Sequence, residues 1–211
     1  MAEAIEMLSN VVEVYDHRLR ALIHPDASLQ KLTDGAIHSE GPVYFQEDDS
    51  IVWSDAHGNR LWRWSAQSGN SVLRDPSDYQ NGNYRDLEGR LVSCSSGLRA
   101  IIRQEHDGQW RVLCDRYQGK RLNSPNDLVV KRDGTIWFTD PPYGITEPNQ
   151  GYGGEQEQPG SYVYRFEPAT GEMDAVITDM LRPNGLCFSP DEQLLYVSDS
   201  SAFNISDGYH H

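Results

Sequence analysis

The chain has 211 residues, of which 37% are hydrophobic and 24% charged, a composition typical of a soluble globular domain. Its formal net charge of −14 argues against nucleic acid and anionic membranes as partners. Its three cysteines form no C-x-x-C pair, which argues against a disulfide framework or a zinc knuckle. The sequence shows no signal-peptide pattern and no long apolar run, so we expect a cytoplasmic protein.

Residues 1–38 differ in pattern from the rest of the chain and form a predicted N-terminal segment. Apolar side chains at mixed helical spacing predict a short helix within residues 10–23. Residues 27–36 are expected to form a strand, whose natural role would be to complete the last blade of the architecture inferred below.

A repeat begins at residue 39 and predicts four similar units. Asp133-Gly134 between two apolar runs is a hairpin signal, and Ile136 and Phe138 alternate with other residues as in a strand. Each unit therefore indicates an antiparallel meander of up to four strands. The first strands align at 39–45, 80–86, 122–130 and 182–188, the second at 47–55, 87–94, 132–140 and 191–199, the third at 59–66, 97–105 and 160–168, and the fourth at 70–75, 109–115 and 172–179.

The spacing of the repeats predicts an all-β fold, a β-propeller. Gly41, Gly82, Asp127 and Gly185 occupy aligned positions separated by 41, 45 and 58 residues, and propeller blades have about 40–50 residues. The longest spacing contains a Gly/Pro-rich insertion at 141–160, which we predict to be a loop beside a ligand site. The fourth repeat shows only two strands, so we expect residues 39–211 to be a partial propeller of about three and a half blades, truncated in its fourth blade, in a fragment of a longer chain.

Each first strand carries a polar residue near its start, at one aligned position: Glu40, Asn81, Asn126 and Asn184. Because the first strand of a blade lines the central channel, these residues are expected to meet around its axis. Glu40, Asn126 and Asn184 combine a carboxylate with amide oxygens, a donor set that suits Ca²⁺, Mg²⁺ or Mn²⁺, whereas Zn²⁺ would lack its usual Cys or His ligands. For each Asn alone, a turn-forming role is the alternative.

Other polar residues near these segments are weaker candidates. Asn81 shares the aligned position and is a candidate for substrate contact, or it simply lines the channel. His38 precedes Glu40 by two positions and could face the same side, with a surface or packing role as the alternative. Asp55, Asp140 and Asp199 end their second strands, where we expect hydrogen bonding at the strand end rather than catalysis.

Three motifs in order resemble the gluconolactonase family, which includes regucalcin (senescence marker protein). They are "EGPVYF" from Glu40, "LNSPNDLVVKRDGTIWFTDPPYGI" from Leu122 and "RPNGLCFSPDEQLLYVSD" from Arg182. The resemblance covers about residues 12–211 and implies a six-bladed β-propeller with a divalent metal ion in its channel. It also implies that Glu40 and Asn184 are metal ligands and that Asn126 contacts the metal or the substrate.

The activity implied by this resemblance is metal-dependent hydrolysis of a sugar lactone, with Ca²⁺ as the favoured ion and Mg²⁺, Mn²⁺ or Zn²⁺ as alternatives. Asn126, Asn81 and His38 are the candidate substrate contacts. The family's acid/base Asp belongs to a later motif that this sequence does not contain, so no catalytic residue is assigned. The alternatives are a non-catalytic propeller that serves as a binding module, and an inactive fragment of the lactonase.

Overall fold

A computed structural model describes residues 6–8 and 12–203 of the chain. The chain divides into two compact units between Gly35 and Ala36. None of the helices in these described ranges is long and apolar enough to cross a membrane.

The N-terminal unit differs from its prediction. It contains an antiparallel pair, β1 (Glu6–Leu8) and β2 (Val12–Val14), and a 3-10 helix, η1 (His17–Ala21), that begins where the Asp16 carboxylate accepts a hydrogen bond from the Arg18 amide. The helix predicted at 10–23 is thus reduced to one short 3-10 segment, because Val12 and Val14 pair with β1 instead; residues 10 and 11 lie outside the described part. The prediction of a strand at 27–36 is wrong, since these residues form no strand.

The second unit consists of antiparallel sheets that follow the predicted repeat. The first is β3 (Ser39–Phe45), β4 (Ser50–Asp55), β5 (Arg60–Ser65) and β6 (Gly69–Arg74); the second is β7 (Gln80–Arg85), β8 (Leu91–Ser95), β9 (Ala100–Gln104) and β10 (Trp110–Cys114); the third is β13 (Leu128–Val130), β14 (Ile136–Asp140), β15 (Tyr162–Glu167) and β16 (Glu172–Ile177). A fourth sheet pairs β17 (Pro183–Phe188) with β18 (Leu195–Asp199). In all four sheets the strands are paired in chain order, as meanders.

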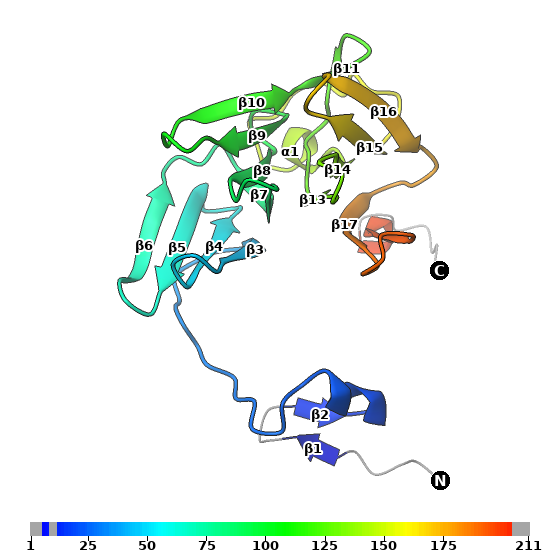
Figure 1. Ribbon diagram of the computed structural model, residues 1–211. Helices are drawn as coiled ribbons and strands as arrows, with labels where there is room; N and C mark the ends of the chain where they lie inside the picture. Colours follow the sequence, from blue (N-terminus) through cyan, green and yellow to red (C-terminus); the bar gives the residue numbers. More distant parts are fainter. Residues whose placement is uncertain (1–5, 9–11, 204–211) are drawn as a thin grey trace. The chain divides into compact units, whose positions relative to one another are not determined.

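Smaller elements connect the sheets. A hairpin of β11 (Arg116–Tyr117) and β12 (Lys120–Arg121) precedes the third sheet, a one-turn helix, α1 (Tyr143–Thr146), begins the predicted insertion, and a 3-10 turn, η2 (Ser201–Phe203), follows β18. Figure 1 shows the sheets of the second unit following one another around an arc, with β3, β7 and β13 on its inner side and β6, β10 and β16 on its outer side. The inner strands contact each other in sequence, β3 with β7, β7 with β13, and β13 with β17.

The core lies between neighbouring sheets rather than in one central layer. The largest cluster joins Val92 and Ile101 of the second sheet to Leu128, Phe138 and Tyr164 of the third. Smaller clusters join the first sheet to the second and the third to the fourth. Strands that are covered on both faces read as continuous apolar runs, and each large side chain buried in this way contributes about 1.5–3 kcal/mol. The sheets therefore hold their neighbours, and the inner strands, in fixed positions.

The aspartates at the ends of the second strands fix the starts of the inner strands. Asp55 accepts the backbone amides of Ile37 and His38 at 3.0 and 3.1 Å, and Asp199 accepts those of Leu181 and Arg182 in the same way. In the third sheet Asp140 accepts the amide of Asn123 at 2.7 Å. The prediction of strand-end hydrogen bonding is confirmed for all three aspartates.

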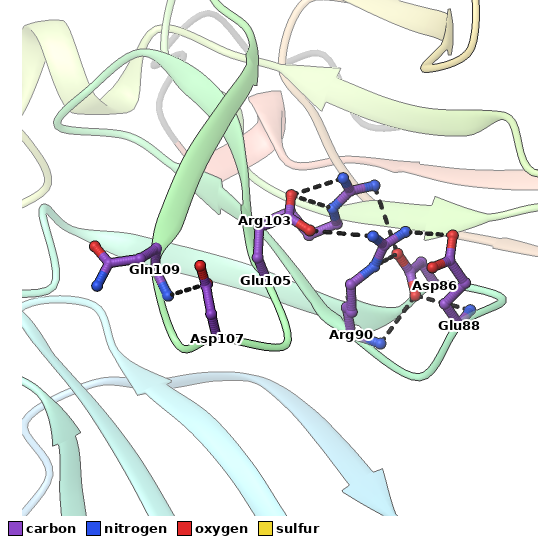
Figure 2. Close-up of polar contacts among 7 residues, drawn as sticks. All are labelled: Asp86, Glu88, Arg90, Arg103, Glu105, Asp107 and Gln109. Atoms are coloured by element: carbon purple, nitrogen blue, oxygen red, sulfur yellow. Dashed lines mark hydrogen bonds and ion pairs between the residues drawn. The ribbon is translucent and has the colours of Figure 1, made fainter.

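An ion-pair network occupies the opposite end of the second sheet, in the turns that follow β7 and β9. Figure 2 shows the Arg90 guanidinium reaching Asp86, Glu88 and Glu105, while Arg103 binds Glu105. The side chains of Arg90 and Arg103 are almost buried. Arg90 pairs with Asp86, and Arg103 pairs with both Asp86 and Glu105. The network thus ties two turns of one sheet together, about one strand length from the starts of the inner strands.

Candidate functional site

The starts of the first three inner strands touch through glycines. A side chain at Gly41, whose φ is +52°, would lie 2.7 Å from the amide nitrogen of Asn83 and 2.8 Å from the Cα of Gly82. The Gly82 amide in turn donates to the carbonyl of Asn126 at 2.7 Å. Only residues without a side chain permit this approach, so the repeated glycine is a requirement of the arrangement.

The fourth inner strand joins the same group through hydrogen bonds. The Thr139 hydroxyl donates to the Asn184 carbonyl at 2.7 Å, and the Leu186 amide donates to Asp127 Oδ2 at 3.2 Å. The structure therefore places the strand starts that carry Glu40, Asn81, Asn126 and Asn184 side by side.

Glu40 and His38 form a half-exposed pair at the start of β3. The Nε2 atom of His38 is 3.0 Å from Oε1 of Glu40, and their side chains are 49% and 40% exposed. Because a carboxylate only accepts, the His38 nitrogen must carry the proton of this hydrogen bond. One oxygen of Glu40 is thereby engaged, and the other has no bond within the described part of the chain.

Asn81 and Asn126 are buried as residues, with 7% and 6% exposure, and neither side chain bonds to any residue that the structure describes; their amide atoms are nevertheless not among the enclosed polar atoms that lack a partner. Asn83, two positions from Asn81, is the contrast: its amide donates to Gly41 and Ser54 and accepts from Ser93. The amides of Asn81 and Asn126 at the strand starts therefore have hydrogen-bonding capacity that the protein does not use and that a ligand or water can take up. The Asn184 side chain makes a single long hydrogen bond within the described part of the chain, to the Ser200 hydroxyl at 3.3 Å.

Asp127 is a carboxylate of this site that the sequence analysis did not assign. Its Oδ1 accepts the Leu128 amide at 2.9 Å and its Oδ2 that of Leu186, so it links the third and fourth sheets. Burial raises the pKa of Asp127 to about 6; these two hydrogen bonds lower it, and the charge of Glu40 raises it. Glu40 and Asp127, from different sheets, therefore act on each other electrostatically.

The donor set has the chemistry of a hard-cation site. Within residues 6–8 and 12–203 no group of three or more His, Cys, Asp or Glu side chains is arranged to hold a metal ion. Glu40, Asn126 and Asn184 instead offer one carboxylate and two amides, and Ca²⁺ and Mg²⁺ take such oxygen ligands from protein side chains. The residues present fit a divalent ion of this class.

The insertion at 141–160 spans three sheets near the strand starts. Apart from α1 it has no regular secondary structure, as predicted. The Tyr152 hydroxyl donates to Asp78, which precedes β7, at 3.0 Å, and the Tyr143 hydroxyl is 2.7 Å from that of Ser200, which follows β18. The insertion is therefore anchored at both sides of the third sheet.

Meandering sheets that follow one another around an arc define a β-propeller, and the candidate site lies at the starts of its inner strands. Residues 38–208 match the family described as SMP-30/gluconolactonase/LRE-like region, so the chain belongs to this family. The predicted fold class, an all-β chain of the β-propeller family, is confirmed together with the predicted family.

Several known proteins resemble the chain. The gluconolactonase of Zymomonas mobilis is 34% identical over 200 residues, which cover 88% of this chain and 55% of that protein. The solved gluconolactonase of Xanthomonas campestris is 47% identical with a TM-score of 0.77, over 80% of this chain and 56% of that one. A calcium-binding regucalcin of Agrobacterium tumefaciens shares the fold, with 18% identity and a TM-score of 0.58, over 77% of this chain and 50% of that one. The chain spans about half the length of these relatives.

Proposed function

We propose that the protein hydrolyses a sugar lactone, such as glucono-1,5-lactone, with the help of a divalent metal ion. The family, and relatives named as gluconolactonases at 34% and 47% identity, support the reaction class. In this proposal the lactonase domain comprises residues 39–211 and follows an N-terminal segment of residues 1–38. A small-molecule lactone is the partner.

Glu40, Asn126 and Asn184 would hold the ion. The observation that carries this assignment is the Asn126 side chain. Its amide has no hydrogen-bond partner in the described part of the chain, although the residue is only 6% exposed and its carbonyl is held by the Gly82 amide. Ca²⁺ is favoured because the donors are hard oxygens of mixed charge. When bound, such an ion would polarise the lactone carbonyl as a Lewis acid.

The side chains around the ion site would orient the substrate. The Asn81 amide can donate to and accept from sugar hydroxyls, and His38 presents a half-exposed ring beside Glu40. Holding the lactone ring in one orientation aligns its carbonyl carbon for attack by water. Water adds to that carbon, the ring C–O bond breaks, and the ring oxygen takes a proton, so the product is a hydroxy acid.

Lactone hydrolysis measured with and without a chelator tests the proposal. We expect chelation to remove turnover, calcium to restore it, and the Glu40→Gln protein to stay inactive at any calcium concentration. Asp49→Asn, in the exposed turn after β3, is the matched control and should behave as the unmodified protein. Hydrolysis that persists in chelator would contradict the role of the ion, and calcium binding without any hydrolysis would favour a binding module.

A further inference from the structure

The turn between β4 and β5 places a second histidine against the candidate site. The ring of His57 stacks on that of His38, with ring centroids 4.4 Å apart and planes inclined by 14°. His38 is the residue whose Nε2 binds Glu40 at 3.0 Å. His57, His38 and Glu40 thus form a continuous row from the turn to the start of β3.

Backbone hydrogen bonds fix the positions of His38 and His57 relative to each other. Asp55 Oδ1 accepts the amides of both His38 and Gly58, the neighbour of His57, at 3.1 and 3.0 Å. The His38 carbonyl accepts the Ala56 amide at 2.9 Å. The hydrogen bonds of Asp55 Oδ1 to the amides of His38 and Gly58 form a backbone clamp. A side chain at Gly58 would collide with the Asp55 carboxylate, so the clamp requires glycine at this position. The stacking is therefore a built feature of the end of β4.

The stack restricts the part of His38 that the backbone leaves free. The backbone clamp fixes where the His38 side chain begins, but its ring can still rotate about two bonds. A parallel ring on one face removes most of these orientations and keeps Nε2 directed at Glu40. Burial and the neighbouring His38 lower the pKa of His57, while the charges of Asp55 and Glu40 raise it.

We propose that His57 is a positioning residue: through His38 it holds the Glu40 carboxylate in the orientation that binds a divalent cation. The inference rests on the proposed role of Glu40 as an ion ligand. His57 touches neither the ion donors nor Glu40 through any hydrogen bond that the described residues show, so its effect passes through the His38 ring.

Two readouts on three variants test this role. The variants are His57→Ala, which removes the stack, His57→Phe, which keeps a flat ring without a titratable group, and His106→Ala, a control in the exposed β9–β10 turn. The first readout is the ¹⁵N tautomer pattern of the His38 ring at pH 8 without metal. The second is calorimetric titration with calcium chloride.

We expect His57→Ala to turn the single Nε2–H tautomer of His38 into a mixture and to weaken calcium binding about threefold to tenfold, the range of one aromatic pair. His57→Phe should restore both, and His106→Ala should change neither. An unchanged His38 tautomer in His57→Ala would overturn the positioning role, even where calcium binds the unmodified protein. Loss of the His38 tautomer without calcium binding by any variant would uphold the positioning of His38 and overturn the proposed ion site.

Discussion

A methyl group at Gly82 should push two inner strands apart. It would lie 2.6 Å from the Cα of Asp127 and 2.8 Å from the carbonyl oxygen of Asn126, whereas carbon atoms pack best at about 3.5–4.0 Å. Both obstacles are backbone atoms, so no side-chain rotation relieves the overlap. Overpacking of this kind costs about 1–3 kcal/mol, and we expect Gly82→Ala to lower the free energy of unfolding by that amount.

The aligned glycine of the fourth sheet provides the control. A methyl at Gly185 meets only Ser198 Oγ at 3.4 Å and Asp127 Oδ2 at 3.8 Å, so Gly185→Ala should change stability by less than about 0.5 kcal/mol. Urea and thermal unfolding measure both, with a fall in Tm of about 3–10 °C expected for Gly82→Ala alone. Equal stabilities of the two variants would refute the claim that the inner strands meet through Gly82.

Two further changes probe buried charge. Arg90→Ala leaves Asp86 and Glu105 with fewer partners and should lower the free energy of unfolding in urea by about 1–2 kcal/mol. Glu88→Ala, whose side chain is 63% exposed, is the control and should lower it by less than about 0.5 kcal/mol. Similar losses in the two variants would contradict the burial of the network. Burial raises the pKa of Asp140 to about 7, above its unfolded value of about 3.9, so the folded protein takes up a proton and loses stability as pH rises from about 4 to 7. Asp140→Asn should remove that loss, so its stability relative to the unmodified protein should increase between pH 5 and pH 8; a difference independent of pH would count against the buried charge.

The repeated sheets were predictable because their signals are local. The turn at Asp133-Gly134 and the apolar residues Ile136 and Phe138 identify one hairpin, and the structure pairs Leu128 with Phe138 as a hairpin requires. The β11–β12 hairpin escaped prediction because Gln118 and Gly119 make its turn with positive φ, a conformation that Asn-Gly would have signalled more clearly.

The N-terminal unit shows where local signals fail. The spacing of Val12 and Val14 is compatible with a helix or a strand. These residues form a strand because they pair with β1. A strand at 27–36 would need a partner to bond with, and the described residues offer none there.

The candidate site was predictable in position but not in its contacts. Repeat phase alone aligned Glu40, Asn126 and Asn184, because equivalent residues of a propeller face the same channel. Asp127 was visible as the exception to glycine at the next position, yet only the structure shows that its carboxylate links Leu128 to Leu186. His57 carries no sequence signal, since its stacking on His38 depends on how the turn after β4 folds back.

The central claim is that the starts of the inner strands form one divalent-cation site. Crystals of the protein grown with Mn²⁺, with data collected near the manganese absorption edge, test it most directly. The account predicts a single anomalous peak about 2.0–2.6 Å from side-chain oxygens of Glu40, Asn126 and Asn184. That peak should be absent from crystals of the Glu40→Gln protein. A peak elsewhere, or none at these three residues in the unmodified protein, would contradict the account.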